Sequence, residues 1–493
     1  MDRSSGILMP ISSLPSPYGI GTFGKAAYRF ADFLHEAGQK YWQLLPLGPT
    51  SYGDSPYQAF STFAGNPYFI DLDTLIADEL LTQTEVDACA WGTEPRYVDY
   101  GKIYESRFAL LEKAKARGWS RDREAVAAFE AENARWLPDY ALFMALKRRF
   151  GMKSWTEWPD EGARLHTPEA VARYRTELRE DVELFTYIQF LFFCQWSALK
   201  RYINGLGIRI IGDIPIYVAM DSSDVWSEPE NFQLDENKKP TEVSGVPPDY
   251  FSADGQLWGN PLYDYEAMRK NGFEWWIRRI GGATKLYDVI RIDHFRGFES
   301  YWAVPCGKTT AKDGHWVKGP GISLVGVLTG WFHDIEFIAE DLGFPTPEVT
   351  QLLADSQLPG MKVLEFAFDS RGTSSYLPHS YGKNCVCYTG THDNAPLALW
   401  RTEADREDVA FAAQYLGLNE REGFNRGIIR GGMGSVAKLF VAQMQGWLDL
   451  GPGHRMNVPG TSCGNWKWRM LPGEASHSLA SSIHEMTRIY GRL

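Results

Sequence analysis

Four acidic residues lie at or just after the ends of apolar segments. Asp213, Asp293 and Glu340 each close a run rich in Ile, Val or Ala, and Asp393 follows such a run after a Thr-Gly-Thr-His segment. A carboxylate there is awkward in a core, because burying an unpaired charge is costly. A cluster of carboxylates suits acetal chemistry, in which an acid protonates the leaving oxygen and an anion meets the charge on the anomeric carbon. Neighbouring negative charges raise the pKa of one member, which keeps that acid protonated near neutral pH.

Eight short β-like runs alternate with helical patterns. Several are continuously apolar, which suits strands buried on both faces of a parallel sheet. We therefore predict an α/β protein with a (β/α)₈ TIM barrel, and a doubly wound open sheet is the second possibility. In a barrel all four acids would share the C-terminal rim, where active sites lie, although any single acid could instead cap a helix. The predicted strands are 6–11, 41–47, 208–216, 287–293, 335–340, 362–368, 384–388 and 454–458.

The long intervals between predicted strands indicate insertions into a single catalytic barrel that spans 1–493. Residues 76–205, after the second strand, have helical spacing and are rich in Ala, Glu, Arg and Leu, so we expect an inserted helical subdomain there. Residues 217–262, after the third strand, are polar and rich in Pro, Asp and Ser, so we expect an inserted loop subdomain. Residues 303–324 are rich in Gly and Lys, and we expect a mobile loop.

Two short motifs point to other chemistries, and we favour neither. Gly19-x-Gly21-x-x-Gly24 matches a dinucleotide fingerprint, but the preceding apolar run ends too early and the next run has no acid for a ribose hydroxyl. Residues 460–464 match G-x-S-x-G around Ser462. A nucleophile elbow needs an acid and a His at later strand ends, and no Asp follows residue 464.

Signals for bound metals and disulfides are weak. The six cysteines form no C-x-x-C pair, which predicts core cysteines in a reducing compartment. Asp71-x-Asp73 lacks the rest of a calcium loop, and no H-E-x-x-H occurs. We therefore expect no metal and no other cofactor.

The net charge of the chain argues against some classes of binding partner. The formal net charge is −12, whereas nucleic acids and anionic membranes favour basic surfaces. The start lacks a leader pattern, and no apolar run reaches the roughly 18 residues of a membrane span. We expect a cytoplasmic protein without nucleic-acid or membrane partners. Aromatic residues reach 14%, which suits both large cores and sugar-binding surfaces.

Longer segments resemble a known family. Three of them resemble the catalytic segments of the α-amylase clan: Arg291-Ile-Asp293-His-Phe-Arg-Gly, Ile338-Ala-Glu340-Asp-Leu-Gly and Thr391-His392-Asp393-Asn. Others look like the amylomaltases, a 4-α-glucanotransferase family: 55–61, 65–71, 212–217 and 246–261. Together the segments run from about residue 6 to 468. The resemblance implies a (β/α)₈ barrel with inserted subdomains and no C-terminal β-sandwich, for which the 35 residues after Val458 are too few.

The same resemblance implies a retaining double displacement with three catalytic carboxylates. By that match, Asp293 is the nucleophile that forms a covalent glucosyl–enzyme bond. Glu340 would protonate the leaving oxygen and then deprotonate the incoming hydroxyl. Asp393 would bind sugar hydroxyls and favour a distorted ring.

Seven further residues are implied in substrate binding. Tyr57 would stack on the donor sugar, whereas Trp258 and Phe366 would line the acceptor side; an aromatic such as Phe366 in an apolar run is also a candidate for the core. The remaining four would orient the carboxylates or bind sugar hydroxyls: Asp213, Arg291, His294 and His392.

We therefore expect a 4-α-glucanotransferase. Its partners would be maltooligosaccharides and starch- or glycogen-type α-glucans, with glucose as an acceptor. Segment 246–262 is the candidate lid that excludes water and so favours transfer. The alternatives are an α-1,4-glucan hydrolase with the same carboxylates and a non-catalytic glycan-binding barrel. The intact set of Asp293, Glu340 and Asp393 argues against the non-catalytic barrel.

Overall fold

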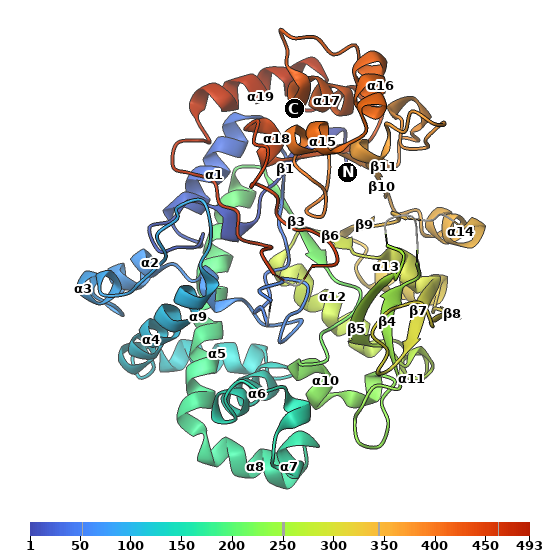
Figure 1. Cartoon of the computed structure of the whole chain (residues 1–493). Helices are drawn as coiled ribbons and strands as arrows, with labels where there is room; N and C mark the ends of the chain where they lie inside the picture. Colours follow the sequence, from blue (N-terminus) through green and yellow to red (C-terminus); the bar gives the residue numbers. More distant parts are fainter. Residues whose placement is uncertain (52, 249–251, 344–345, 462) are drawn as a thin grey trace.

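A closed parallel barrel forms the centre of the computed structural model, which describes residues 1–51, 53–248, 252–343, 346–461 and 463–493 (Figure 1). Within these ranges the sheet has eight strands in the order β10-β11-β12-β1-β2-β3-β6-β9. Ala339 N–H donates to the Pro359 carbonyl at 3.0 Å, so β9 and β10, the strands at the two ends of this order, lie side by side and close the barrel. The (β/α)₈ prediction is confirmed, and the open sheet is wrong. The strands are β1 (Ser4–Leu8), β2 (Tyr41–Gln43), β3 (Arg209–Ile214), β6 (Val289–Ile292), β9 (Glu336–Ala339), β10 (Gly360–Val363), β11 (Cys385–Tyr388) and β12 (Leu439–Gln443).

One predicted strand was wrong. Residues 454–458 have no strand, and the eighth strand is β12, which pairs with both β11 and β1. Its sequence, Leu-Phe-Val-Ala-Gln, leads directly into the short helix α18 (Met444–Trp447). An apolar run with no turn residue between strand and helix can be read as either element, because both are buried here.

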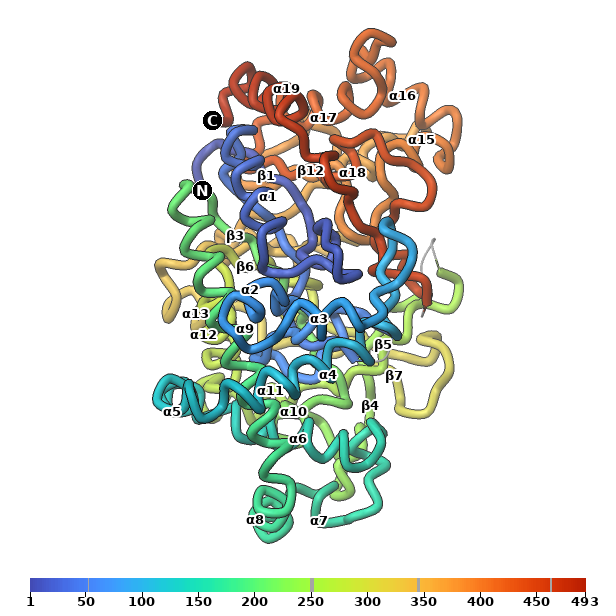
Figure 2. Tube along the Cα trace, turned by 90° about the vertical axis from the view of Figure 1, so that its left-hand side faces the viewer, coloured from blue at the N-terminus to red at the C-terminus, as the bar shows by residue number. Residues whose placement is uncertain are grey.

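Helices surround the barrel. In α1 the residues at helical spacing, Ala27, Phe30, Ala31 and Leu34, are buried as their pattern predicts. Both chain termini lie at the same end of the molecule (Figures 1 and 2), where the Arg492 guanidinium donates to the Ser4 carbonyl at 2.8 Å. No helix in the described ranges is long and apolar enough to cross a bilayer. The helices near the barrel, apart from α18, are α1 (Lys25–Glu36), α11 (Tyr265–Lys270), α12 (Glu274–Leu286), α13 (Ile322–Trp331), α14 (Pro347–Ser356), α15 (Leu397–Glu403), α16 (Arg406–Leu416), α17 (Phe424–Gly434) and α19 (His477–Ile489).

A helical region between β2 and β3 holds the long loop that follows β2. Two glutamines of α9 each pair with a backbone amide group of that loop: Gln189 with Gly65 (2.7 and 2.9 Å) and Gln195 with Asp71 (2.6 and 3.2 Å). The loop that carries Tyr57 is thereby anchored. Whether 76–205 behaves as a separate subdomain stays a prediction. The helices of this region are α2 (Leu72–Ala77), α3 (Gln83–Asp87), α4 (Tyr100–Gly118), α5 (Arg123–Glu132), α6 (Leu137–Arg149), α7 (Glu161–Arg164), α8 (Pro168–Glu177) and α9 (Arg179–Gly205). In Figure 2, α2, α3 and α9 lie near the middle of the view, and α7 and α8 lie at its lower end.

A second, antiparallel sheet lies beside the barrel (Figure 1). Its strand order is β5-β4-β7-β8. The expected loop 303–324 contains β8 paired with β7, so part of it is regular structure, and its mobility stays a prediction. Of the candidate lid, β5 is described, but residues 249–251 lie outside the described residues. The elements inserted after β3 and β6 are α10 (Ser223–Ser227), β4 (Glu242–Val246), β5 (Gln256–Pro261), β7 (Ser300–Pro305) and β8 (His315–Lys318).

Candidate functional site

The four acids identified in the sequence lie at one rim of the barrel. Asp213 is the penultimate residue of β3, Asp293 and Glu340 directly follow β6 and β9, and Asp393 is the fifth residue after β11. The strands are parallel and in register, with Asp213 opposite Arg291 and Arg291 opposite Ile338. Their carboxyl ends therefore bring these side chains together at the C-terminal face, where barrel enzymes carry their active sites.

Arg291 links two of the carboxylates. Its Nη1 donates to both oxygens of Asp213 at 2.7 Å and to Oδ1 of Asp293 at 3.0 Å. Arg291 and Asp213 are almost wholly buried, whereas the Asp293 side chain is 30% exposed. Removing either partner of such a buried ion pair would leave an uncompensated charge in the interior, which is strongly destabilising. Asp293 alone of the two acids thus presents an oxygen to the open side of the site.

Burial and neighbouring charge separate the proton affinities of Asp293 and Glu340. Burial raises the pKa of Glu340, and the negative charge of Asp293 raises it further. Burial also raises the pKa of Asp293, but the adjacent Arg291 guanidinium opposes that shift. The pair therefore favours a proton on Glu340 and a negative charge on Asp293, the distribution that an acid and a nucleophile need.

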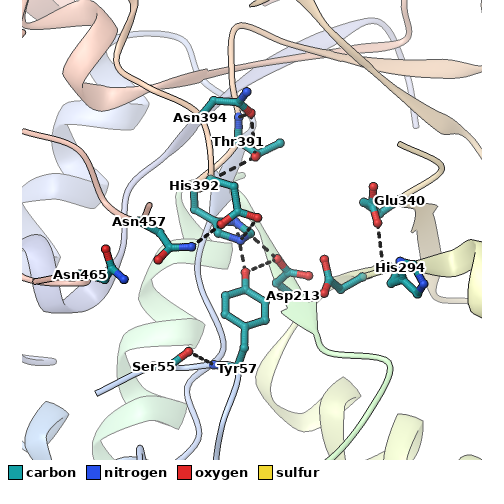
Figure 3. A network of polar contacts seen from close by, with 12 residues as sticks. Ser55, Tyr57, Asp213, His294, Glu340, Thr391, His392, Asn394, Asn457 and Asn465 are labelled. Carbon is teal, nitrogen blue, oxygen red and sulfur yellow. Dashed lines mark hydrogen bonds and ion pairs between the residues drawn. The ribbon is translucent and has the colours of Figure 1, made fainter. Parts of the chain in front are cut away.

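A left-handed turn at His294 holds Glu340 in place. His294 has φ 49° and ψ 46°, a conformation that is uncommon for a residue with a side chain. It directs the His294 backbone N–H toward Oε2 of Glu340 at 2.7 Å, while Leu342 N–H donates to Oε1 at 2.9 Å. Burial lowers the pKa of the His294 imidazole to about 3, so this ring is neutral. Figure 3 shows Glu340 and His294 together on one side of the site.

On the other side, Tyr57, His392 and Asp213 form a connected group (Figure 3). The Tyr57 hydroxyl donates to Oδ2 of Asp213 at 2.7 Å and lies 3.1 Å from Nδ1 of His392, whose ring stacks on Tyr57 at 4.8 Å. Nε2 of His392 is 3.4 Å from Asp393. Burial lowers the pKa of His392, but Asp393 and Asp213 outweigh that effect and the net shift is upward. The imidazolium in turn holds the pKa of Asp393 well below its usual range, against its burial.

Three residues around Asp393, Tyr57 and His392 were not predicted from the sequence. Asn457 Nδ2 donates to Oδ1 of Asp393 at 2.6 Å, and Arg455 donates to the Asp393 backbone carbonyl at 2.7 Å. The Trp466 ring lies 5.7 Å from Tyr57 and 5.8 Å from His392. All three belong to the loop after α18, part of which we had predicted to be a strand. Its cluster of Gly, Pro and Asn was the signal for a loop.

The two aromatic residues expected on the acceptor side have different surroundings. Trp258, on β5, lies edge-to-face with His294, with the ring centroids 4.9 Å apart. Phe366 is in a short 3₁₀ turn after β10, contacts Tyr376 and is 40% exposed. Exposure on this scale argues against a core role for Phe366, and the predicted strand 362–368 in fact ends at Val363.

The dinucleotide-like motif does not form a binding site for a pyrophosphate. A Cβ at Gly21 would stand 1.9 Å from the Ile11 carbonyl, and one at Gly24 would stand 2.0 Å from the Asp71 carboxylate. The protein itself therefore fills the space that a pyrophosphate would need at the start of α1. Ser462, of the G-x-S-x-G motif, lies outside the described residues. Within the described ranges, no group of three or more His, Cys, Asp or Glu side chains is arranged to hold a metal ion.

A parallel barrel with a pair of carboxyl groups at its C-terminal rim suits enzymes that cleave and transfer glycosidic bonds, which use one carboxyl group as an acid and another as a nucleophile or base. A family model described as 4-alpha-glucanotransferase matches residues 9–474. The chain belongs to this family.

The similarity to individual known proteins extends along the whole chain. A 4-alpha-glucanotransferase of Clostridium butyricum is 50% identical over 98% of this chain and 100% of its own, and one of Thermus thermophilus is 47% identical over the full length of both. The structure of an amylomaltase from Streptococcus agalactiae in complex with acarbose superposes with a TM-score of 0.97, at 42% identity, over 99% of each chain.

Proposed function

We propose that this chain transfers segments of α-1,4-glucan from one chain to the 4-hydroxyl of another, as a retaining 4-α-glucanotransferase. The main support is that the carboxyl groups of Asp293 and Glu340 differ in proton affinity. Arg291 contacts Asp293 at 3.0 Å, whereas burial and the Asp293 charge favour a proton on Glu340. An α-1,4-glucan hydrolase would use the same carboxylates. Transfer is the better supported of the two, since the family and the relatives are glucanotransferases.

In the first step, Glu340 protonates the glycosidic oxygen of the donor as Asp293 attacks the anomeric carbon. The glycosidic C–O bond breaks, the Asp293 oxygen forms a glycosyl ester, and the shortened chain leaves with the proton of Glu340. Asp393, which His392 and Asn457 hold, stabilises the positive charge on the ring and binds its hydroxyls. Tyr57 stacks on this donor sugar.

In the second step, the 4-hydroxyl of an acceptor glucan attacks the same carbon. Glu340, now ionised, takes the hydroxyl proton, and the ester to Asp293 breaks. Two inversions leave the α-configuration retained. Trp258 and Phe366 line the acceptor side, and His294 and His392 bind sugar hydroxyls near the cleavage point. Segment 246–262 excludes water during the transfer.

The partners that we propose are maltooligosaccharides and starch- or glycogen-type glucans, with glucose as the smallest acceptor. We also propose a cytoplasmic location. In its support, all six cysteines are free, and two of them, Cys385 and Cys387, lie on one strand without a disulfide. Unpaired cysteines in such number are typical of a reducing compartment.

Maltotriose as the only substrate tests this proposal. We expect longer maltooligosaccharides together with released glucose, and Asp293→Asn should abolish both. Asp313→Asn is the matched control, because it makes the same exchange at an exposed acid paired with Lys308. Glucose and maltose with nothing longer than maltotriose would mean hydrolysis, and unchanged maltotriose would contradict both activities.

A further inference from the structure

A fifth acid, Glu365, lies at the same rim and has no part in the reaction described above. It is the second residue after β10, and its backbone N–H donates to the Thr389 carbonyl at 3.3 Å. Its carboxyl points at Gly390, where an added Cβ would stand 2.7 Å from Oε1 of Glu365. A side chain at this position would push the Glu365 carboxyl aside. Glu365 thus packs against the start of the loop that carries His392 and Asp393.

The surroundings of Glu365 connect it to that loop through Asn394. Asn394 lies beside Glu365, because a Cβ added at Gly390 would stand 2.9 Å from the Asn394 Cβ as well as 2.7 Å from Oε1 of Glu365. The side-chain oxygen Oδ1 of Asn394 accepts from the Thr391 N–H and hydroxyl, each at 2.9 Å. These bonds close a short turn over 391–394, and Asp393 is part of it.

Few charges oppose or balance an ionised Glu365. The nearby charged groups are Arg455 and Glu403. Arg455 is engaged elsewhere: it donates to the backbone carbonyls of Asn457 and Asp393 at 2.6 and 2.7 Å, and Nη1 is 3.9 Å from Glu403. Within the described ranges, Glu365 has no ion pair, and its Oε1 is shielded from solvent without a hydrogen-bond partner. An ionised carboxylate there would be poorly compensated.

We propose that Glu365 is a positioning residue of the transfer reaction, held as a neutral carboxylic acid beneath the 389–394 loop, where it packs against Gly390 beside Asn394 and so fixes the orientation of Asp393. The proposal rests on the role assigned above to Asp393. Burial is also the largest cause of a pKa for Glu365 that lies well above its usual value, with Arg455 opposing it.

The variant Glu365→Gln distinguishes the neutral acid from an ionised one, because an amide copies the shape of the neutral acid. We expect its kcat for maltotriose disproportionation at pH 7 to stay within about twofold of the wild type. Glu365→Ala should lower kcat about tenfold with little change in KM, because misplaced groups act mainly on the transition state. Glu403→Gln, which alters only the outer acid near Arg455, should match the wild type.

Thermal midpoints provide a readout that does not depend on activity. An acid whose pKa is raised in the folded state contributes its full stability below the unfolded pKa of about 4.3, and that stability is lost as pH rises toward the folded pKa. Glu365→Gln lacks this loss. Its thermal midpoint should therefore rise relative to wild type as the pH increases from 5 to 8.

Each outcome decides a separate point. If Glu365→Gln loses stability relative to wild type as pH rises, and loses activity as Glu365→Ala does, the carboxylate is ionised and the proposal is wrong. A fully active Glu365→Ala would remove the positioning role. If Glu365→Ala does not fold, the glutamine variant alone decides by its pH-dependent midpoint. A wild type that shows no transfer refutes the proposed function, while the thermal comparison still tests the proton on Glu365.

Discussion

Replacement of Arg291 by methionine should shift the pH dependence of transfer toward alkaline pH. Asp293 must be ionised to attack, so activity is present above its pKa and is lost as pH falls through it. The guanidinium of Arg291 lowers that pKa from a distance of 3.0 Å. Methionine retains much of the volume of the side chain but has no charge, so the nucleophile would lose its ionic partner.

The size of the shift follows from the geometry. At 3.0 Å and an effective dielectric constant of about 20, Coulomb's law gives about 5.5 kcal/mol between the two charges. Asp293 is 30% exposed, so water replaces part of this interaction, and we take about half, or about 2.7 kcal/mol, as the net loss. That corresponds to an upward shift of about two pKa units, because one unit is 1.36 kcal/mol. Asp213 also loses its partner, which should lower stability by about 3 kcal/mol.

The assay is the initial rate of glucose release from maltotriose between pH 4 and 9, for wild type and Arg291→Met. The acidic limb of kcat/KM should move up by about two pH units in the variant. Arg291→Lys is the control: it keeps a charge but not the planar fork, and its limb should move less. If the methionine variant is slower at every pH but keeps its acidic limb unchanged, Arg291 does not maintain the ionisation of Asp293 and the reasoning fails.

Two further predictions concern the groups on either side of Asp293. Because burial and Asp293 raise the pKa of Glu340, activity should decline as pH rises through that raised value. Glu340→Gln should retain binding of maltotriose, measured by calorimetry, while transfer is lost. A Glu340→Gln enzyme that still transfers would remove this residue from the acid–base role. Asn457→Ala removes the 2.6 Å hydrogen bond to Asp393. This variant should lower kcat about tenfold, equivalent to about 1.4 kcal/mol, in the same glucose-release assay. An unchanged rate would show that His392 alone suffices to hold Asp393.

Local sequence patterns were sufficient to predict the barrel and the acids at its rim. Continuous apolar runs ending in Asp213, Asp293 and Glu340 indicate buried parallel strands, and a parallel arrangement places all their carboxyl ends on one face. This inference needs only local pattern, because strand burial is encoded within each run. The roles of these acids came from longer motifs that resemble a family, and they stay predictions until the variants are measured.

The side chains that complete the site are brought together only by tertiary contacts. Asn457 and Trp466 approach Asp393 and Tyr57 from positions distant in the chain, and no local pattern encodes such contacts. The left-handed turn at His294 and the approach of Glu365 to Gly390 likewise depend on neighbouring strands. The choice of 439–443 over 454–458 for the eighth strand was also a tertiary matter, because an apolar run becomes a strand only where two neighbouring strands offer hydrogen-bond partners.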